Sequence, residues 1–269
     1  MTALDLTTNW PVPNASALVV QRDEIVSTAG DVCKVQQLAS LSKPICSWAI
    51  LVAIEEGVIT LETPLGQTGC TLRHLLSHAG GYPFDDPAPT ALPERKRIYS
   101  NTGFDLAAAA VEQATAMTFS DYLQEAVLAP LGMNSSTLAG PAASGMIGST
   151  QDVGAFIQEV RSPTLLHPTT AAEAVRVQYA YLAGTVPGVG RYDLCPWGLG
   201  FEIRGAKQPH WTGKLNSELT YGHFGAAGTM FWIDPAIDLA LVALADLPFD
   251  KWALSAWPEL SDAVIEEYA

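Results

Sequence analysis

Ser40 and Lys43 are the two residues of this chain whose types and spacing most directly suggest chemistry. They lie three residues apart in the first turn of a predicted helix, so their Cβ atoms are neighbours on one face. The segment from Pro44 to Ile54 is almost entirely apolar, which places the helix in the protein interior. Burial disfavours the ammonium form and lowers the pKa of a lysine. Such a lysine beside a serine hydroxyl forms a nucleophile with its own base.

Two further polar clusters follow along the chain. Tyr99-Ser100-Asn101 ends a Pro- and Asp-rich loop and precedes a predicted helix, and His223-Phe224-Gly225 lies in a strand-like run. Taken singly, each cluster is weak evidence. Ser-x-x-Lys is usually a helix cap with a solvated lysine, Tyr-Ser-Asn is usually a turn, and His-Phe-Gly is usually a strand residue beside a bend. Their order, and the apolar surroundings of the first pair, favour a shared active site.

The ordered motifs Ser-x-x-Lys, Tyr-x-Asn and His-x-Gly resemble those of the serine β-lactamase and penicillin-binding superfamily. The nearest branch contains class C β-lactamases, D-alanyl-D-alanine carboxypeptidases and related esterases. Four further segments are similar to family segments: Leu72–Gly81, Pro130–Met133, Trp197–Gly200 and Gly222–Gly228. The resemblance covers nearly the whole chain and implies a β-lactamase/transpeptidase-like fold.

The resemblance implies a role for each motif residue. Ser40 would attack the substrate carbonyl and form an acyl-enzyme, while Lys43 and Tyr99 would share the proton transfers. Tyr99 can do so only if a nearby cation favours its phenolate, and Lys43 is the candidate. Asn101 would hydrogen-bond Lys43 and the substrate. The backbone N–H groups of Ser40 and Ala226 would form the oxyanion hole.

His223 departs from the usual pattern of the family. Typical β-lactamases carry a lysine here, whose charge helps to hold the substrate carboxylate, whereas a histidine is mostly neutral at pH 7. Carboxylate binding is therefore expected to be weakened. The glutamate used for deacylation in class A enzymes is also missing, so deacylation would depend on Tyr99.

Other residues near the motifs have less certain roles. Gly225 and Gly228 are expected to let substrate approach the strand closely. Trp211 could line the cleft, although packing on the sheet is an equally good interpretation. Asp85, Asp86 and Glu94 in the loop before the second motif are expected to be solvated rather than catalytic.

His74 and His78 lie four residues apart and could suggest a metal pair. The glutamate of a His-Glu-x-x-His motif is absent, however, and a structural role is favoured. We therefore expect no metal and no cofactor.

The elements that must position these residues change character along the chain. A hairpin over 17–28, a strand over 34–38 and the apolar helix come first, and helices joined by loops occupy about 61–185. Strand character returns at 197–203, 221–234 and 239–246, and a final helix over 251–268 is expected to be interrupted at Trp257-Pro258. We predict an α/β (α+β) fold: an antiparallel sheet from both termini, flanked by helices, with a helical subdomain. The sheet subdomain would comprise residues 1–60 and 186–269, the helical one 61–185, in a single compact catalytic unit.

Composition limits the classes of partner. The 269 residues are 48% hydrophobic and 16% charged, and the net charge of −14 argues against nucleic acid or an anionic membrane as partners. A small molecule is the expected substrate, and nothing in the sequence indicates an oligomeric state. The four cysteines show no paired or metal-ligand spacing. The first ten residues lack the basic and apolar regions of a signal peptide, so a cytoplasmic location is expected.

The expected reaction is acyl transfer to water through a seryl intermediate. Small esters or amides are the favoured substrates, with a carboxylesterase ahead of a D-alanyl-D-alanine carboxypeptidase and a weak β-lactamase third. The alternative from another class is a penicillin-binding protein without turnover, which the intact motifs disfavour. The chain is shorter than class C enzymes, and a more open cleft is expected.

Overall fold

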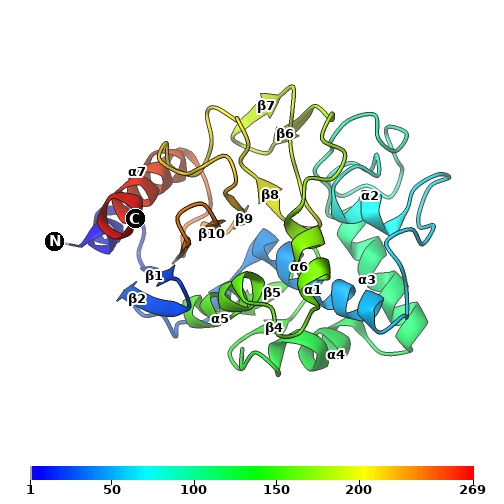
Figure 1. The fold of residues 1–269 in the computed structure, drawn as a ribbon, viewed down its shortest axis with the longest axis horizontal. Helices are drawn as coiled ribbons and strands as arrows, with labels where there is room; N and C mark the ends of the chain where they lie inside the picture. Colours follow the sequence, from blue (N-terminus) through cyan, green and yellow to red (C-terminus); the bar gives the residue numbers. More distant parts are fainter. Residues whose placement is uncertain (1) are drawn as a thin grey trace.

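A six-stranded antiparallel sheet forms one half of the protein, in the computed structural model of residues 2–269 (Figure 1). The strand order is β2-β1-β11-β10-β9-β8. The strands are β1 (Ala15–Gln21), β2 (Glu24–Ala29), β8 (Glu202–Ile203), β9 (Tyr221–Gly225), β10 (Thr229–Asp234) and β11 (Leu239–Ala245). Strands from both ends of the chain lie side by side, because β1 pairs with β11. The predicted sheet is confirmed.

Both faces of this sheet are covered. All residues of β10 and β11 are buried, as expected for strands packed on two sides. Alternate residues of β1 enter different cores, since side chains alternate between the faces of a strand: Leu18 packs with helix α1 and Val19 with helix α7. The two helices are α1 (Ser42–Glu55) and α7 (Lys251–Tyr268), and the 3₁₀ helix η1 (Ala3–Asn9) lies beside α7.

Helix α1 is the buried centre of the molecule. The 3₁₀ turn η2 (Ala39–Leu41) precedes it, and Gly57, with φ of 75°, follows its end. Trp48 on α1 contacts Phe156 at 5.9 Å and Phe201 at 6.2 Å between ring centroids. The remaining helices are α2 (Leu72–Leu76), α3 (Thr102–Thr115), α4 (Phe119–Leu123), the π-helical η3 (Gln124–Leu128), α5 (Thr150–Arg161) and α6 (Pro168–Val175). Of these, α3, α4 and η3 pack on α1, and α5 packs on β1 and β11.

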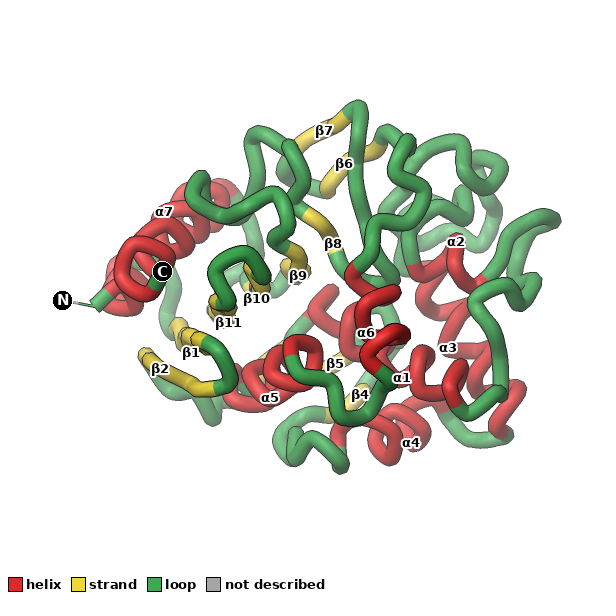
Figure 2. The backbone as a smooth tube through the Cα atoms, in the orientation of Figure 1, coloured by secondary structure: helices red, strands yellow, loops and turns green. Residues whose placement is uncertain are grey.

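Two small sheets and long loops complete the fold (Figure 2). The predicted strand over 34–38 shortens to β3 (Gln36–Gln37) and pairs with β5 (Met146–Gly148) instead of joining the main sheet. A second partner of β5 is β4 (Thr137–Leu138), and β6 (Gly184–Val186) forms a hairpin with β7 (Gly190–Tyr192). The α6 helix and this hairpin were not predicted from the sequence.

Three other predictions of elements need correction. Of the strand-like segment 197–203, only β8 is a strand. Residues 221–234 form the β9–β10 hairpin, not one strand, and the turn contains Gly228 at a φ of 89°. Helix α7 continues through Pro258. The proline cannot donate to the carbonyl of Leu254, one turn earlier in the helix.

No helix among residues 2–269 combines the length and the apolar character needed to cross a membrane.

Candidate active site

Ser40 and Lys43 meet at the entrance to helix α1. Ser40 lies in the η2 turn, and Lys43, one turn later, is fully buried. The Lys43 Nζ atom lies 3.2 Å from Ser40 Oγ, 2.6 Å from Asn101 Oδ1 and 3.0 Å from the carbonyl oxygen of Ala143. An ammonium group has three hydrogens to donate, so these three acceptors satisfy it completely. The predicted spatial pairing of Ser40 and Lys43 is therefore present.

Burial controls the charge of this lysine. It lowers the pKa of Lys43 from 10.5 to about 7, and the nearby Asp105 and Asp85 only partly oppose the effect. At neutral pH a substantial fraction of Lys43 is therefore a free amine. A free amine 3.2 Å from a serine hydroxyl can accept its proton.

Asn101 has only one possible orientation. Its Oδ1 accepts from Lys43, and its Nδ2 donates to Asp85 Oδ1 at 2.8 Å. Because lysine only donates and a carboxylate only accepts, the amide cannot be turned over without losing both bonds. Asp85 is exposed, as predicted, and its carboxylate also positions Asn101.

Tyr99 faces Lys43 with its ring. The Lys43 Nζ atom lies 4.6 Å from the ring centroid, and the Tyr99 hydroxyl lies 3.5 Å from His223 Nε2. Burial raises the pKa of Tyr99 well above its usual value, although interaction with the Ser40 hydroxyl opposes this. The expectation that Lys43 favours a phenolate is therefore wrong for the resting enzyme, in which Tyr99 is a neutral phenol.

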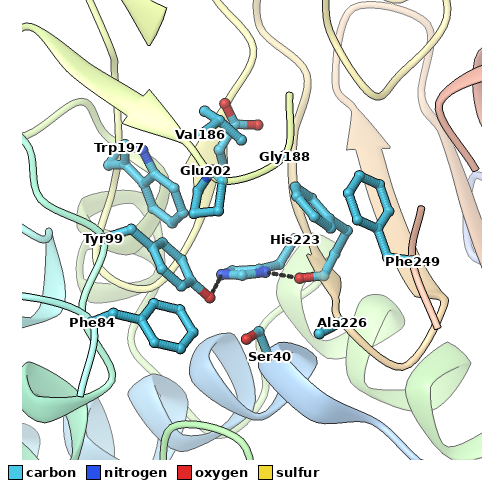
Figure 3. Close-up of a pocket in the computed structure, with 12 residues that line it drawn as sticks. Ser40, Phe84, Tyr99, Val186, Gly188, Trp197, Glu202, His223, Ala226 and Phe249 are labelled. Carbon is cyan, nitrogen blue, oxygen red and sulfur yellow. Dashed lines mark hydrogen bonds between the residues drawn. The ribbon is translucent and has the colours of Figure 1, made fainter. Parts of the chain in front are cut away.

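His223 is a buried, neutral imidazole (Figure 3). Its Nδ1 lies 2.7 Å from the carbonyl oxygen of Phe224, which can only accept, so Nδ1 carries the proton and Nε2 is free to accept from Tyr99. Burial, with a further contribution from Lys43, lowers the pKa of His223 to about 3. The third motif therefore presents no cation at neutral pH, in agreement with the sequence prediction.

The structure shows a packing role for Gly225 and Gly228, while their predicted role in substrate approach stays a prediction. A Cβ atom on Gly225 would lie 2.5 Å from the carbonyl oxygen of Leu38, and one on Gly228 would lie 2.0 Å from that of Leu247. Thr229 donates to the same Leu38 oxygen at 2.9 Å. These contacts hold the end of β9 against the turn that carries the nucleophile.

An apolar cavity of roughly 180 Å³ opens in front of the nucleophile (Figure 3). Ser40 and Ala226 both border this cavity, so the two residues predicted to form the oxyanion hole line the same space. Ala226 lies in the turn after β9 rather than within the strand, and its carbonyl accepts from the Phe249 amide at 3.0 Å. Aromatic side chains, including Phe84, Trp197 and Phe249, form much of the wall.

Trp211 does not border this cavity. It is buried, its ring packs on that of Phe224 at 5.6 Å, and its indole Nε1 donates to Glu202 Oε2 at 3.1 Å. Of the two predicted interpretations, packing beside the sheet is the correct one. Trp197, whose segment was expected to be a strand, lines the cavity instead.

A buried polar network behind the cavity was not predicted. Glu202 borders the cavity, its Oε1 forms an ion pair with Lys207, and its Oε2 lies 3.0 Å from His210 Nε2. These partners lower the pKa of Glu202 despite its burial. The only signal in the sequence is that Glu202 interrupts an otherwise apolar segment, Trp197–Ile203.

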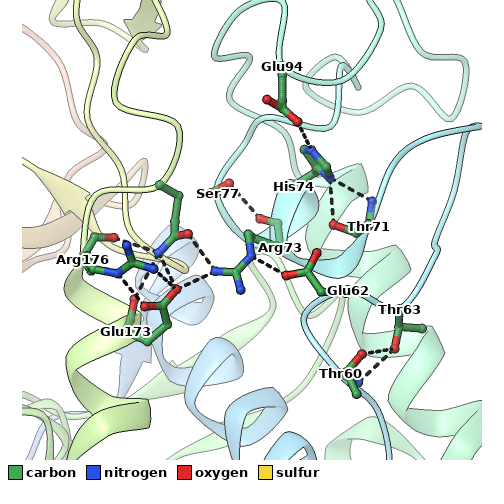
Figure 4. Close-up of polar contacts among 11 residues, drawn as sticks. Thr60, Glu62, Thr63, Thr71, Arg73, His74, Ser77, Glu94, Glu173 and Arg176 are labelled. Atoms are coloured by element: carbon green, nitrogen blue, oxygen red, sulfur yellow. Dashed lines mark hydrogen bonds and ion pairs between the residues drawn. The ribbon is translucent and has the colours of Figure 1, made fainter.

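Polar contacts hold the loop that leads to Tyr99 (Figure 4). The His74 Nδ1 accepts from the Thr71 amide at 3.0 Å, and its Nε2 lies 3.0 Å from Glu94 Oε1. His78 Nδ1 accepts from the Ser100 amide at 3.1 Å. Both histidines therefore have structural roles, and no group of three His, Cys, Asp or Glu within residues 2–269 is arranged to hold a metal. Glu94 is exposed, as predicted, and its carboxylate also anchors the loop through His74 and Tyr181.

Arg73 ties the same region to helix α6. It bonds Glu62 at 2.8 Å and Glu173 at 2.5 Å (Figure 4). His78 also packs on the Tyr99 ring, with 4.5 Å between centroids. His78 therefore holds Tyr99 and the rest of the second motif in place.

Comparisons with known proteins agree with this geometry. The family model described as "Beta-lactamase" matches residues 9–256. A crystal structure of a β-lactamase (Mb2281c) from Mycobacterium bovis is 43% identical and covers 99% of both chains, with a TM-score of 0.98. EstCE1, described as a hydrolase with promiscuous acyltransferase activity, is 16% identical over 97% of both chains, with a TM-score of 0.81, which shows a shared fold alone.

Curated relatives are longer than this chain. A proposed D-alanyl-D-alanine carboxypeptidase of Escherichia coli (strain K12) is 24% identical over 257 residues, which cover 70% of this chain and 59% of that protein. A penicillin-binding protein of Bacillus subtilis (strain 168) is 29% identical over 131 residues, 36% of this chain and 29% of that protein. The chain therefore spans less than two thirds of the length of both.

Proposed function

Because this chain belongs to the β-lactamase family, whose members are hydrolases, we propose that it cleaves small esters through a covalent intermediate on Ser40. One observation carries the proposal: Ser40, beside a lysine of lowered pKa, opens on an apolar cavity where the third motif presents a neutral histidine.

The acylation step uses groups already in contact. The neutral amine of Lys43 takes the proton of Ser40 Oγ as that oxygen bonds to the substrate carbonyl carbon. The negative charge on the carbonyl oxygen is stabilised by the backbone N–H groups of Ser40 and Ala226. The Tyr99 phenol donates a hydrogen bond to the leaving oxygen, and the proton held by Lys43 leaves with the alcohol. Water then cleaves the acyl-enzyme, with Lys43 accepting its proton and returning it to Ser40.

The walls of the cavity favour esters without charge beside the scissile bond. Phe84, Trp197 and Phe249 can pack against an alkyl or aryl group but cannot pair with a carboxylate. His223, neutral at pH 7, offers no charge to one either. β-Lactams and D-alanyl-D-alanine peptides carry a carboxylate close to the scissile bond, and both are therefore expected to react more slowly.

β-Lactam hydrolysis is the second candidate. It is supported by the 43% identity to the Mycobacterium bovis protein described as a β-lactamase. Peptidase activity is supported by the more distant Escherichia coli relative.

Parallel assays rank these activities. We expect p-nitrophenyl butyrate to be cleaved with a higher kcat/KM than a chromogenic cephalosporin or a D-alanyl-D-alanine peptide. A fluorophosphonate probe should label the wild type and not Ser40→Ala. Cephalosporin turnover above ester turnover would reverse the order. Labelling without turnover of any substrate would instead indicate a penicillin-binding protein that only acylates.

A further inference from the structure

A second cavity, of roughly 510 Å³, adjoins the one in front of Ser40. The two share Phe84, Tyr99 and Pro187 as lining residues, so they are direct neighbours, and an extended substrate at Ser40 would reach the second cavity past these side chains. Three basic residues line this adjoining groove, Lys96, Arg97 and Arg191, and no acidic residue does. In a chain with 14 basic and 28 acidic residues, such a groove is an exception.

Arg97 is a buried cation without a carboxylate partner among residues 2–269. Only 3% of it is exposed, and its guanidinium donates to main-chain carbonyls, at 3.0 Å to Cys195, 2.7 Å to Gln178 and 3.2 Å to Tyr179, and also to Ser77. Carbonyl dipoles solvate the charge but do not neutralise it. Burial lowers the pKa of Arg97 only to about 10, so it is charged at pH 7. Arg97 therefore places a permanent positive charge beside the groove, while its N–H groups are held by carbonyls, so direct contacts to an anion would come from the other two basic residues.

Lys96 and Arg191 are exposed at the rim of the groove, and neither forms an ion pair in the described part of the chain. Strand pairing brings them to the same place. Arg97 forms a bridge with Gly184 at the start of β6, and the neighbouring Thr185 pairs with Arg191 on β7. The β6–β7 hairpin thus presents Arg191 on the side of the groove where residues 96 and 97 lie.

We propose that this groove binds an anionic group, a carboxylate in the simplest case, at the end of one arm of the substrate whose scissile carbonyl lies at Ser40. The inference rests on the proposed function and makes it more specific. It is compatible with the neutral His223, because the anion would lie beyond Tyr99 and away from the scissile bond. The substrate class is then an ester with an apolar centre and a distal negative charge.

Matched esters test the proposal through activity. Mono-p-nitrophenyl glutarate and p-nitrophenyl pentanoate have acyl chains of equal length that end in a carboxylate and a methyl group. The butyrate esters of 4-hydroxybenzoate and 4-hydroxybenzamide make the same comparison on the leaving-group side. We expect the anionic member of at least one pair to have the higher kcat/KM, by roughly tenfold for each cation engaged. The preference should fall with added salt.

Variants connect this preference to the groove. Lys96→Gln and Arg191→Gln together should abolish it and leave the neutral ester unaffected, whereas Lys214→Gln, an exposed lysine outside both cavities, should preserve it. Equal rates within both pairs, or a preference that survives the double variant, would overturn the proposal.

A binding measurement separates this proposal from the proposed function. Glutarate should bind the Ser40→Ala variant in calorimetry, and binding should be lost when Lys96→Gln and Arg191→Gln are added. If glutarate binds in this way but no ester is cleaved, the groove is supported and the esterase proposal fails. If esters are cleaved but glutarate does not bind and no anionic ester is preferred, the groove proposal fails alone.

Discussion

The rate of acylation should follow the neutral fraction of Lys43 as pH changes. Only the free amine can take the proton of Ser40, and burial places the pKa of Lys43 at about 7. The kcat/KM for p-nitrophenyl butyrate should therefore fall as pH falls below 7 and reach a plateau above pH 8.

The size of the effect distinguishes a buried lysine from an ordinary one. For a pKa of about 7, the neutral fraction rises roughly tenfold from pH 6 to pH 8 and then levels off. A solvated lysine, with a pKa of about 10.4, would give a rise of about a hundredfold over the same range and no plateau. The lowering of the Lys43 pKa from 10.5 to about 7 corresponds to about 5 kcal/mol, which is the free-energy cost of charging Lys43 inside the protein.

A pH profile of kcat/KM in buffers of constant ionic strength provides the measurement. The control is His223→Asn, because His223 is neutral throughout this range, with a pKa lowered to about 3. This variant should lower the rate but keep the midpoint near pH 7. A midpoint above pH 9, or one that disappears with His223, would refute the assignment of Lys43 as the base.

Three other perturbations test the stability of the site. Lys43 binds fewer protons when folded than when unfolded between pH 7 and 10, so wild-type stability should rise across this window; Lys43→Met should remove about 2.3 kcal/mol of that rise from pH 7 to 9 in urea unfolding, and identical slopes would contradict the burial argument. Gly225→Ala should cost about 1–3 kcal/mol in thermal or urea unfolding, because its Cβ would lie 2.5 Å from the Leu38 oxygen, and an unchanged midpoint would show that the turn yields easily. Glu202→Gln should cost about 3–5 kcal/mol by leaving Lys207 buried and unpaired, and a smaller loss on adding Lys207→Met would identify the unpaired charge as the cause.

The convergence of the three motifs could be predicted because their order resembles that of the β-lactamase superfamily, and local pattern places the first of them inside the protein. An apolar helix beginning at Ser40 must lie inside, and a polar residue one turn later must then find buried partners. The strand-like segments at both ends of the chain likewise indicated one sheet. Asn101 and His223 indeed lie at the Ser40–Lys43 pair, from a loop and a strand far along the chain.

The remaining features depend on contacts between distant segments. Tyr99 is a neutral phenol because burial raises its pKa, and sequence alone does not specify how deeply the Tyr99 hydroxyl is buried. Asp85 looks like any exposed loop carboxylate until Asn101 is placed beside it. The close packing of Gly225 on the carbonyl of Leu38 could not be predicted, because the two residues are nearly two hundred positions apart in sequence.

The pairing of β1 with β11 has a consequence for biosynthesis. Ala15 pairs with Ala245, so the sheet cannot close until about 230 further residues have been made. At typical rates of about 5–20 residues per second, this takes roughly 10–50 s. During that time the β1–β2 hairpin is only marginally stable and its apolar edge is unprotected. Ser40 and Lys43 emerge early in synthesis, but the nascent chain cannot acylate before β9 arrives, and chaperone demand should be greatest in this interval.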